Sequence, residues 1–133
     1  MRILLIDDHH YGLAQVQAAV PAELRERVTL EHLTSFAAYR AVGAPEVDVV
    51  LLDFYLDLDR TTGNRVAHEI RARHLVAFSS VPRCSRRIVE ELEPLARSRG
   101  WPVLHAVHKL SREPNEELRV LFETILPPLC AGG

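Results

Sequence analysis

The chain has little of what characterises secreted, membrane-spanning and nucleic-acid-binding proteins. It carries only two cysteines, Cys84 and Cys130, too few for a disulfide framework. No apolar run approaches the roughly 18 residues that span a bilayer. Met1–Ile6 is not a signal peptide, because its apolar run is very short and acids follow at once. The formal net charge is −2, which favours neither nucleic acid nor a membrane surface as a partner. We therefore expect a cytoplasmic protein.

Length and composition fit one globular domain. The chain has 133 residues, of which 47% are apolar and 26% charged, ordinary values for a soluble protein. A chain of this length buries about two-thirds of its unfolded surface on folding. We predict one domain over 1–126 and a flexible tail over 127–133, because the Pro127-Pro128 pair is expected to stop the last helix.

Apolar runs alternate with amphipathic segments five times along the chain. The patterns predict strands at 1–6, 28–33, 47–52, 75–78 and 103–108. They predict helices at about 9–20, 35–42, 64–73, 85–99 and 114–126, with a polar loop at 53–62. Strands that alternate with helices form a parallel sheet with helices on both faces, joined by right-handed crossovers. We therefore predict an α/β fold with a doubly wound five-stranded parallel sheet of order 2-1-3-4-5.

Two of the apolar strands end in acid. Asp7 and Asp8 follow the first strand, and Asp53 follows the third. In the predicted order these strand ends are neighbours, at the crevice where such sheets bind ligands. Three carboxylates there repel one another, by roughly 4 kcal/mol per pair at about 4 Å and an effective dielectric near 20. Oxygen ligands favour a hard divalent cation such as Mg²⁺. Capping of a helix N-terminus is the alternative reading of Asp7 and Asp8.

The fourth and fifth strands end in a hydroxyl and an ammonium group at the same edge of the sheet. Ser79 can donate a hydrogen bond to an anion, and Lys109 can act as a point charge for phosphate. A metal ion and a lysine together could hold a phosphoryl group in line with a carboxylate, and an aspartate can accept that group as an acyl phosphate. A serine that closes a strand and a solvated lysine are the simpler alternatives.

With these residues in this order, the chain from Ile3 to Ile125 resembles the receiver domain of two-component response regulators, which has a flavodoxin-like fold. The resemblance implies that Asp53 accepts the phosphoryl group. It also implies that Ser79 hydrogen-bonds that group and that Lys109 neutralises its charge. The implied ligands of Mg²⁺ are Asp7, Asp8, Asp53 and the backbone carbonyl of Tyr55.

The resemblance further implies a switch in phosphorelay signalling. A histidine kinase or phosphotransfer protein would phosphorylate the domain, which would then change its affinity for a downstream protein partner. Such a domain is not a turnover enzyme, because it catalyses only its own phosphorylation and dephosphorylation. We expect no direct binding to nucleic acid or membrane, and a homodimer stays an open alternative.

The chain departs from the family pattern on the usual signalling face. Asp57 stands where the family has a proline after the acceptor, Leu110 where a proline follows the lysine, and Ala106 where an aromatic residue precedes it. These departures favour a second hypothesis, a pseudo-receiver that binds a protein partner without phosphorylation. A third hypothesis is an enzyme, because Asp57-Leu-Asp59-Arg-Thr61 matches the Asp-x-Asp-x-Thr motif of haloacid-dehalogenase-like phosphatases. The preceding Phe54–Leu56 is too short for the strand that this motif needs.

Histidines lie close to the predicted site in the sequence. His9 and His10 follow the acids, and His105 and His108 lie in the fifth strand. None has the spacing of a helical zinc motif. We interpret them as surface or supporting residues, with tuning of the phosphoryl lifetime by His9 or His10 as a further hypothesis.

Overall fold

A computed structural model of the chain describes residues 1–53, 55–56, 61–62 and 69–131. Its main sheet is five-stranded and parallel with the order β2-β1-β3-β6-β7, which confirms the predicted order and the α/β flavodoxin-like fold. The strands are β1 (Arg2–Ile6), β2 (Thr29–Leu33), β3 (Val47–Leu52), β6 (Ala72–Ser79) and β7 (Val103–His108). The segment predicted as a polar loop also contains two short antiparallel strands, β4 (Tyr55–Leu56) and β5 (Thr61–Thr62).

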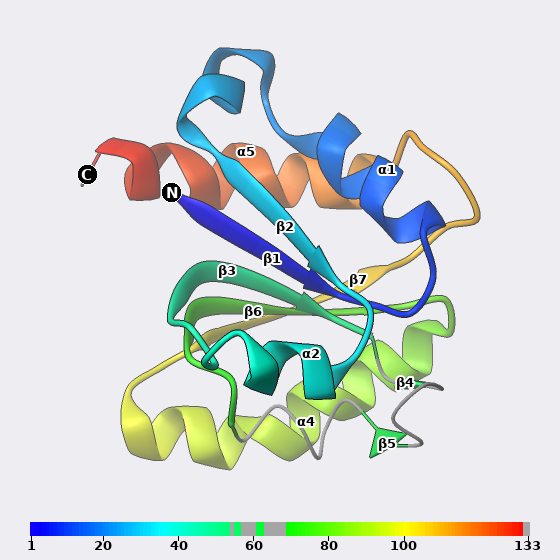
Figure 1. Ribbon diagram of the computed structural model, residues 1–133, viewed down its shortest axis with the longest axis vertical. Helices are drawn as coiled ribbons and strands as arrows, with labels where there is room; N and C mark the ends of the chain where they lie inside the picture. The colour runs from blue at the N-terminus through cyan, green and yellow to red at the C-terminus, as the bar shows by residue number, and fades with distance from the viewer. Residues whose placement is uncertain (54, 57–60, 63–68, 132–133) are drawn as a thin grey trace.

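Helices cover both faces of the main sheet (Figure 1). On one face lie α1 (Tyr11–Ala19) and α5 (Glu116–Ala131), and on the other lie α2 (Phe36–Ala41) and α4 (Pro82–Arg99). A 3-10 turn, η1 (Ala22–Arg27), connects α1 to β2. No described helix is long and apolar enough to cross a bilayer.

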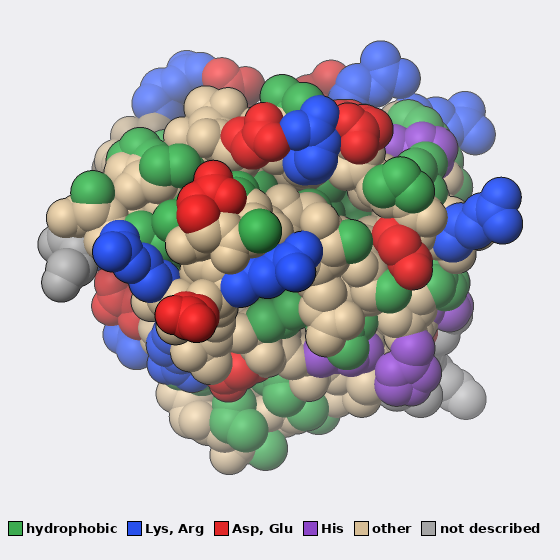
Figure 2. Space-filling view, turned by 90° about the horizontal axis from the view of Figure 1, so that it is seen from above, with side chains coloured by type: hydrophobic (Ala, Val, Ile, Leu, Met, Phe, Trp, Pro, Cys, Tyr) green, Lys and Arg blue, Asp and Glu red, His purple; other side chains and the backbone are tan. Residues whose placement is uncertain are grey.

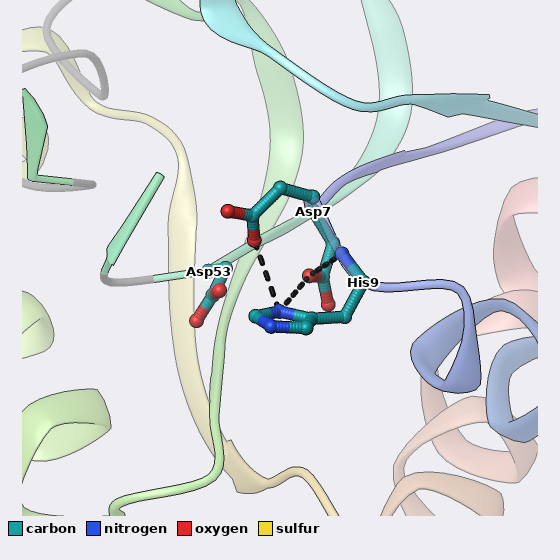
Figure 3. A group of neighbouring side chains, drawn as sticks. Asp7, His9 and Asp53 are labelled. Atoms are coloured by element: carbon teal, nitrogen blue, oxygen red, sulfur yellow. Dashed lines mark hydrogen bonds and ion pairs between the residues drawn. The ribbon is translucent and has the colours of Figure 1, made fainter. Parts of the chain in front are cut away.

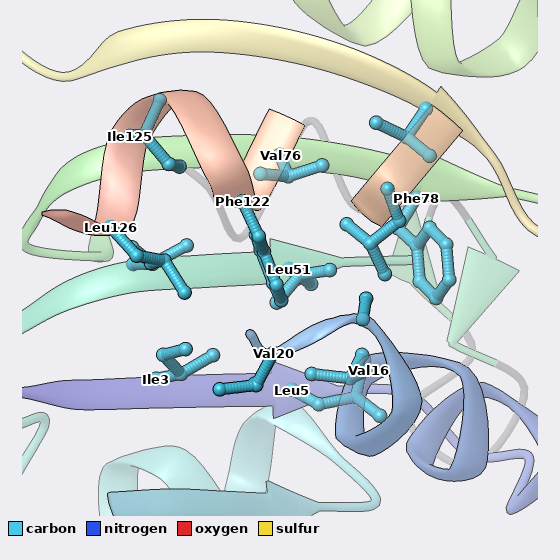
Figure 4. Close-up of a cluster of buried hydrophobic side chains, with 14 of the residues drawn as sticks. Ile3, Leu5, Val16, Val20, Leu51, Val76, Phe78, Phe122, Ile125 and Leu126 are labelled. Atoms are coloured by element: carbon cyan, nitrogen blue, oxygen red, sulfur yellow. The ribbon is translucent and has the colours of Figure 1, made fainter. Parts of the chain in front are cut away.

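The apolar run of β1 contributes to two separate cores. Ile3 and Leu5 pack into the core beneath α1 and α5 (Figure 4), and Leu4 and Ile6 into the core beneath α2 and α4. Because successive side chains of a strand point to opposite faces, an unbroken apolar run is buried on both sides, and all four side chains are at most 1% exposed. This double burial suits the interior position of β1 between β2 and β3, where its carboxyl end lies beside that of β3.

Helix α2 begins where the sequence predicts it. The Ser35 side chain accepts a hydrogen bond from the Ala38 N–H at 3.0 Å, which satisfies one of the free N–H groups of the first turn. Helix α4 begins at Pro82, three residues earlier than predicted, and proline suits this first-turn position because it has no N–H to satisfy.

The helix predicted at 64–73 ends too late. Strand β6 begins at Ala72, which pairs with Val47 of β3, so Ala72 and Arg73 belong to the sheet. Residues 63–68 of the predicted helix lie outside the described residues. The apolar contacts of Ala72 on a neighbouring strand decide its conformation, and helical periodicity in the sequence does not reveal them.

The prediction that the last helix stops at Pro127-Pro128 was wrong. Helix α5 continues through both prolines to Ala131, so the tail predicted to be flexible is helical up to that residue. Prolines inside a helix remove backbone hydrogen bonds. Here the surrounding turns compensate by burial, because Leu126 is fully buried and Leu129 and Cys130 pack against the core beneath α1 and α5.

Two histidines on neighbouring strands form a stacked pair. Nδ1 of His74 lies 2.9 Å from Nε2 of His105, and their ring centroids are 5.2 Å apart. Burial lowers the pKa of both rings; Arg73 lowers the pKa of His74 further, while Asp48 opposes this. A hydrogen bond between two ring nitrogens needs at least one neutral ring to accept it, and the lowered pKa of each ring favours its neutral form.

We expect this pair to make the folded protein less stable in mild acid. The unfolded rings take up protons near pH 6.5, whereas the folded rings take them up only at lower pH. The free energy of unfolding should therefore fall as the pH drops below about 6.5. Urea unfolding of wild type and of the His74→Gln, His105→Gln double variant between pH 7.5 and 5 checks this. The prediction is wrong if the difference in the free energy of unfolding between wild type and the double variant does not change with pH.

Candidate functional site

Three carboxylates and one imidazole meet at the carboxyl ends of β1 and β3. Oxygens of Asp7, Asp8 and Asp53 and a ring nitrogen of His9 all lie within 4.8 Å of one another, and Figure 3 shows how Asp7, His9 and Asp53 face each other. Asp7 is fully buried and Asp53 is 5% exposed. The structure therefore confirms that the three acids gather where the sequence predicts, and it adds His9, which the sequence analysis had placed among supporting residues.

Backbone hydrogen bonds fix the aspartates at the end of the sheet. The Asp53 N–H donates to the Ile6 carbonyl at 3.1 Å, and the Asp7 N–H donates to the Leu33 carbonyl at 3.0 Å. His32 of β2 lies 2.7 Å from the Asp7 carbonyl through its Nε2. Asp7 and Asp53 therefore each extend the hydrogen bonding of the sheet by one residue. These bonds hold the main chain in place, so both side chains project from a fixed position at the edge of the sheet.

Lys109 reaches the same cluster from the end of β7. It is 2% exposed, and its Nζ donates to Oδ2 of Asp7 at 2.8 Å and lies 3.4 Å from Oδ2 of Asp53. Burial alone would lower the pKa of Lys109, but the charges of Asp7 and Asp53 outweigh it and hold the pKa above its usual 10.5. The side chain is therefore an ammonium ion at neutral pH, and it is not the solvated lysine of the simpler reading.

The carboxyl group of Asp53 is difficult to ionise in this environment. Its pKa is raised from 3.8 to about 6; burial is the main cause, the charges of Asp7 and Asp8 raise the pKa as well, and Lys109 lowers it. Lys109 does not cancel the effect of burial, since it lies closer to Asp7 than to Asp53. The anionic form of Asp53 would therefore be stabilised by any additional cation that entered the cluster.

Ser79 ends β6 next to Lys109. Its carbonyl accepts the Lys109 N–H at 2.8 Å, and its Oγ accepts the Val81 N–H at 3.2 Å. A hydroxyl that accepts one hydrogen bond still has its proton to donate, which suits the predicted contact with an anion. Tyr55, the predicted carbonyl ligand, lies in β4 two residues after Asp53. The roles of Ser79 and Tyr55 stay predictions.

The hypothesis of a phosphatase depends on two further acidic residues. Asp57 and Asp59, which form the phosphatase-like motif, lie outside the described residues. The site built by Asp7, Asp8 and Asp53 does not depend on them, and nothing in the described structure supports the phosphatase reading.

A pair of buried amides holds the main chain on both sides of Lys109. Gln15 of α1 accepts the Leu110 N–H at 2.9 Å and donates to the Leu110 carbonyl at 2.6 Å. Asn115 donates to Gln15 at 2.9 Å and to the His108 carbonyl at 2.8 Å. Because the residues before and after Lys109 are both bound, its side chain is aimed at the acids from a fixed backbone. The sequence analysis missed both amides.

The sequence could have indicated the role of Asn115 but not that of Gln15. The side chain of Asn115 accepts the Leu118 N–H at 3.1 Å and so caps α5, and an asparagine before a helix is a recognisable cap signal. Gln15 carries no such signal, because polar residues on a helix are ordinarily exposed and this one is fully buried.

Gly12 lets α1 pass directly over the Asp7–Lys109 pair. A Cβ atom at this position would lie 2.8 Å from Oδ2 of Asp7 and 3.5 Å from Cδ of Lys109. The first of these distances is shorter than an unstrained carbon–oxygen contact. A glycine inside a helix is unfavourable by propensity, so its presence here marks the close approach of the helix to the buried ion pair.

We expect Gly12→Ala to destabilise the protein, although alanine is the better helix former. The methyl group must displace the Asp7 carboxylate or α1, which should lower the free energy of unfolding by about 1–3 kcal/mol. The matched control is Ala18→Gly at an exposed position of the same helix, which should cost about 0.5–1 kcal/mol from propensity alone. Urea unfolding measures both; a stabilised Gly12→Ala variant would show that the site yields to the methyl group at no cost.

Comparisons of the chain with protein-family models, with curated proteins and with solved structures found no match.

Proposed function

We propose that the protein is a receiver of the two-component signalling type, in which Asp53 accepts a phosphoryl group in the presence of Mg²⁺ and phosphorylation acts as a conformational switch. The observation that carries this proposal is the setting of the Asp53 carboxylate. It is nearly buried, 3.4 Å from the Lys109 ammonium and within 4.8 Å of the other acids. The flavodoxin-like sheet, with this cluster at its carboxyl edge, supports the same conclusion.

The residues fit a hard divalent cation. The proposed ligands are carboxylate oxygens of Asp7, Asp8 and Asp53, with the Tyr55 carbonyl as a further donor, and oxygen donors are those that Mg²⁺ prefers. When bound, the ion supplies positive charge that offsets the charge on the carboxylates and on the oxygens of an incoming phosphoryl group.

The protein's own groups supply the rest of the reaction. A carboxylate oxygen of Asp53 attacks the phosphorus atom; the new oxygen–phosphorus bond forms as the bond from phosphorus to the donor breaks, and the donor keeps that electron pair. Lys109, held as an ammonium ion, neutralises a phosphoryl oxygen without giving up its proton. The Ser79 hydroxyl donates a hydrogen bond to another oxygen. Positioning and neutralisation of charge are the main requirements of phosphoryl transfer.

In this proposal the donor is a phosphohistidine of a histidine kinase or phosphotransfer protein, and the readout is a changed affinity for a downstream protein. The domain catalyses only its own phosphorylation and dephosphorylation. Hydrolysis of the acyl phosphate by water returns the Asp53 carboxylate and releases inorganic phosphate, so the switch resets without a second enzyme.

The test is incubation with a small phosphodonor, such as acetyl phosphate or phosphoramidate, in the presence of Mg²⁺. We expect wild type to gain the mass of one phosphoryl group, and neither the Asp53→Asn variant nor wild type in EDTA to gain any. Asp48→Asn, an acid-to-amide change at the opposite end of β3, should still gain the group. Intact-mass spectrometry measures all four samples, and no gain in wild type with several donors would contradict the proposal.

A phosphorylation-independent binding module is the second candidate, and one observation favours it. Ala106 stands in β7, paired with Ala77 of β6, where the resemblance leads us to expect an aromatic residue that changes orientation on phosphorylation. An alanine has no side chain to reorient. The phosphodonor experiment separates the two candidates, because only the switch requires a gain of mass at Asp53.

A further inference from the structure

The imidazole of His9 faces the acidic cluster. Its Nδ1 lies 3.0 Å from Oδ1 of Asp8 and 3.5 Å from Oδ1 of Asp7, and Figure 3 shows the ring beside the carboxylates of Asp7 and Asp53. Its side chain is 45% exposed, whereas the Asp7 side chain is fully buried and that of Asp8 is 6% exposed. His9 therefore stands on the solvent side of the cluster, where a cation would enter.

These separations match those of two ligands on one cation. Ligand atoms that lie about 2.1 Å from an ion at right angles to each other are about 3 Å apart. The contact of His9 Nδ1 with Oδ1 of Asp8, at 3.0 Å, is of this length, and the contact with Oδ1 of Asp7, at 3.5 Å, is longer. The nitrogen also belongs to the set of ligand atoms that lie within 4.8 Å of one another, so it can join the carboxylates around one ion without a change of fold.

The ring is held in this direction by its neighbours. The His9 N–H donates to Oδ1 of Asp7 at 2.9 Å, which turns the chain back over the carboxylate. On the other side the His9 ring lies 5.3 Å from the ring of Tyr11, and the Tyr11 ring in turn lies 5.1 Å from the Lys109 ammonium. These contacts hold the imidazole against the acids, while 45% of the His9 side chain stays exposed to solvent.

We propose that His9 is a nitrogen ligand of the site's cation and gives the site a preference for first-row transition ions such as Mn²⁺ and Co²⁺ over Mg²⁺. Imidazole nitrogen binds Co²⁺ more strongly than Mn²⁺, and both more readily than Mg²⁺, which strongly favours oxygen and retains its water. A site of carboxylates alone would favour these ions over Mg²⁺ less strongly than a site that adds a nitrogen ligand. The inference rests on the proposed function, since it concerns the cation that the Asp53 site uses, and it names a ligand beyond the oxygens assigned there.

Metal titrations on protein without an affinity tag test the inference. Isothermal titration calorimetry should show that His9→Gln weakens Co²⁺ binding about tenfold or more and Mg²⁺ binding by less than about threefold. His10→Gln, a change of an adjacent exposed histidine outside the cluster, should leave both affinities close to wild type. Equal losses for the two metals in His9→Gln, or no loss for either, would overturn the inference.

A spectroscopic measurement on wild type makes the test independent of how well the variant folds. Electron spin-echo modulation of bound Mn²⁺ should show coupling to an imidazole nitrogen in wild type and in His10→Gln, and none in His9→Gln. Wild type without nitrogen coupling overturns the proposal outright. Failure of the proposed function is recognised separately, as the absence of phosphorylation at Asp53 in Mg²⁺ together with normal nitrogen coupling in Mn²⁺.

Discussion

Replacement of Lys109 by methionine should lower the free energy of unfolding by about 3–5 kcal/mol in metal-free protein at neutral pH. The ammonium is 2% exposed and lies between Asp7 and Asp53 at 2.8 and 3.4 Å. Methionine fills a similar volume but leaves the carboxylates buried without their cation. Removal of one partner from a buried charge pair costs far more than loss of the pair's net attraction, because the remaining charge stays desolvated.

Two conditions should reduce this loss. A divalent cation would replace the missing positive charge, so added Mg²⁺ should stabilise Lys109→Met more than it stabilises wild type. Acid should also reduce the loss, because the pKa of Asp53 is already about 6 in wild type and can only rise when Lys109 is absent. Chemical unfolding at pH 7.5 and pH 5, with EDTA and with Mg²⁺, measures the four conditions.

The matched control is Arg97→Met on α4. Arg97 pairs with Glu93 at 2.8 Å, but its side chain is 76% exposed, so its removal should change stability by about 0.5 kcal/mol or less. If Lys109→Met and Arg97→Met cost the same, the ammonium of Lys109 contributes no more than a surface charge, and the electrostatic account of the site is wrong.

Asp53→Asn should stabilise the protein in EDTA while abolishing phosphorylation. The pKa of Asp53 is raised from 3.8 to about 6, which means that folding disfavours its ionised form. The corresponding loss of wild-type stability develops as the pH rises from about 4 to about 6 and is complete above that range. Removal of the charge should therefore increase the free energy of unfolding by about 1–3 kcal/mol at pH 7.5 and by little at pH 4.

The stabilisation by Mg²⁺ should be much larger in wild type than in Asp53→Asn. Mg²⁺ should raise the unfolding free energy of wild type, because an ion that binds only the folded state stabilises it, and Asp53→Asn should show a much smaller rise. Asp48→Asn serves as the control, since Asp48 accepts a hydrogen bond from the Arg2 N–H at 2.8 Å and lies at the other end of β3. A wild-type protein that gains no stability from Mg²⁺ would contradict the metal site.

The use of lysine in this chain makes the site unusually accessible to experiment. Lys109 is the single lysine among 16 lysine and arginine residues, so selective isotope labelling of lysine gives one side-chain signal from the centre of the site. The lysine ammonium is a compact point charge on a flexible four-carbon stem, which lets it lie between the carboxylates of Asp7 and Asp53.

Some sequence predictions were correct because the pattern of neighbouring residues already determines how a segment must be buried or capped. A run of consecutive apolar residues such as Ile3–Ile6 must be buried on both faces, which places it in a parallel sheet between layers of helices. The carboxyl ends of such strands share one rim, so Asp7, Asp8 and Asp53 had to gather there. Ser35 as a helix cap follows from the same kind of local chemistry.

Other predictions failed where contacts across the fold oppose local preference. Pro127 and Pro128 favour a helix end, but burial of the turns around them keeps α5 helical to Ala131. Ala72 and Arg73 continue a helical pattern, yet pairing with β3 places them in β6. Neither outcome can be read from neighbouring residues, since the deciding contacts come from distant parts of the chain.

The sequence by itself determined the parallel sheet and the set of charged strand ends, because burial on two faces and strand direction are properties of short segments. The strand order was predicted from the common doubly wound topology, and the structure confirmed it. Only the tertiary structure decided how the charges are arranged. Lys109 meets Asp7 across 102 residues of chain, Gln15 holds the main chain after Lys109, and His9 turns its ring toward the acids. Each arrangement depends on distances between segments that meet only after folding, and small changes in these distances decide whether a charged group has a partner.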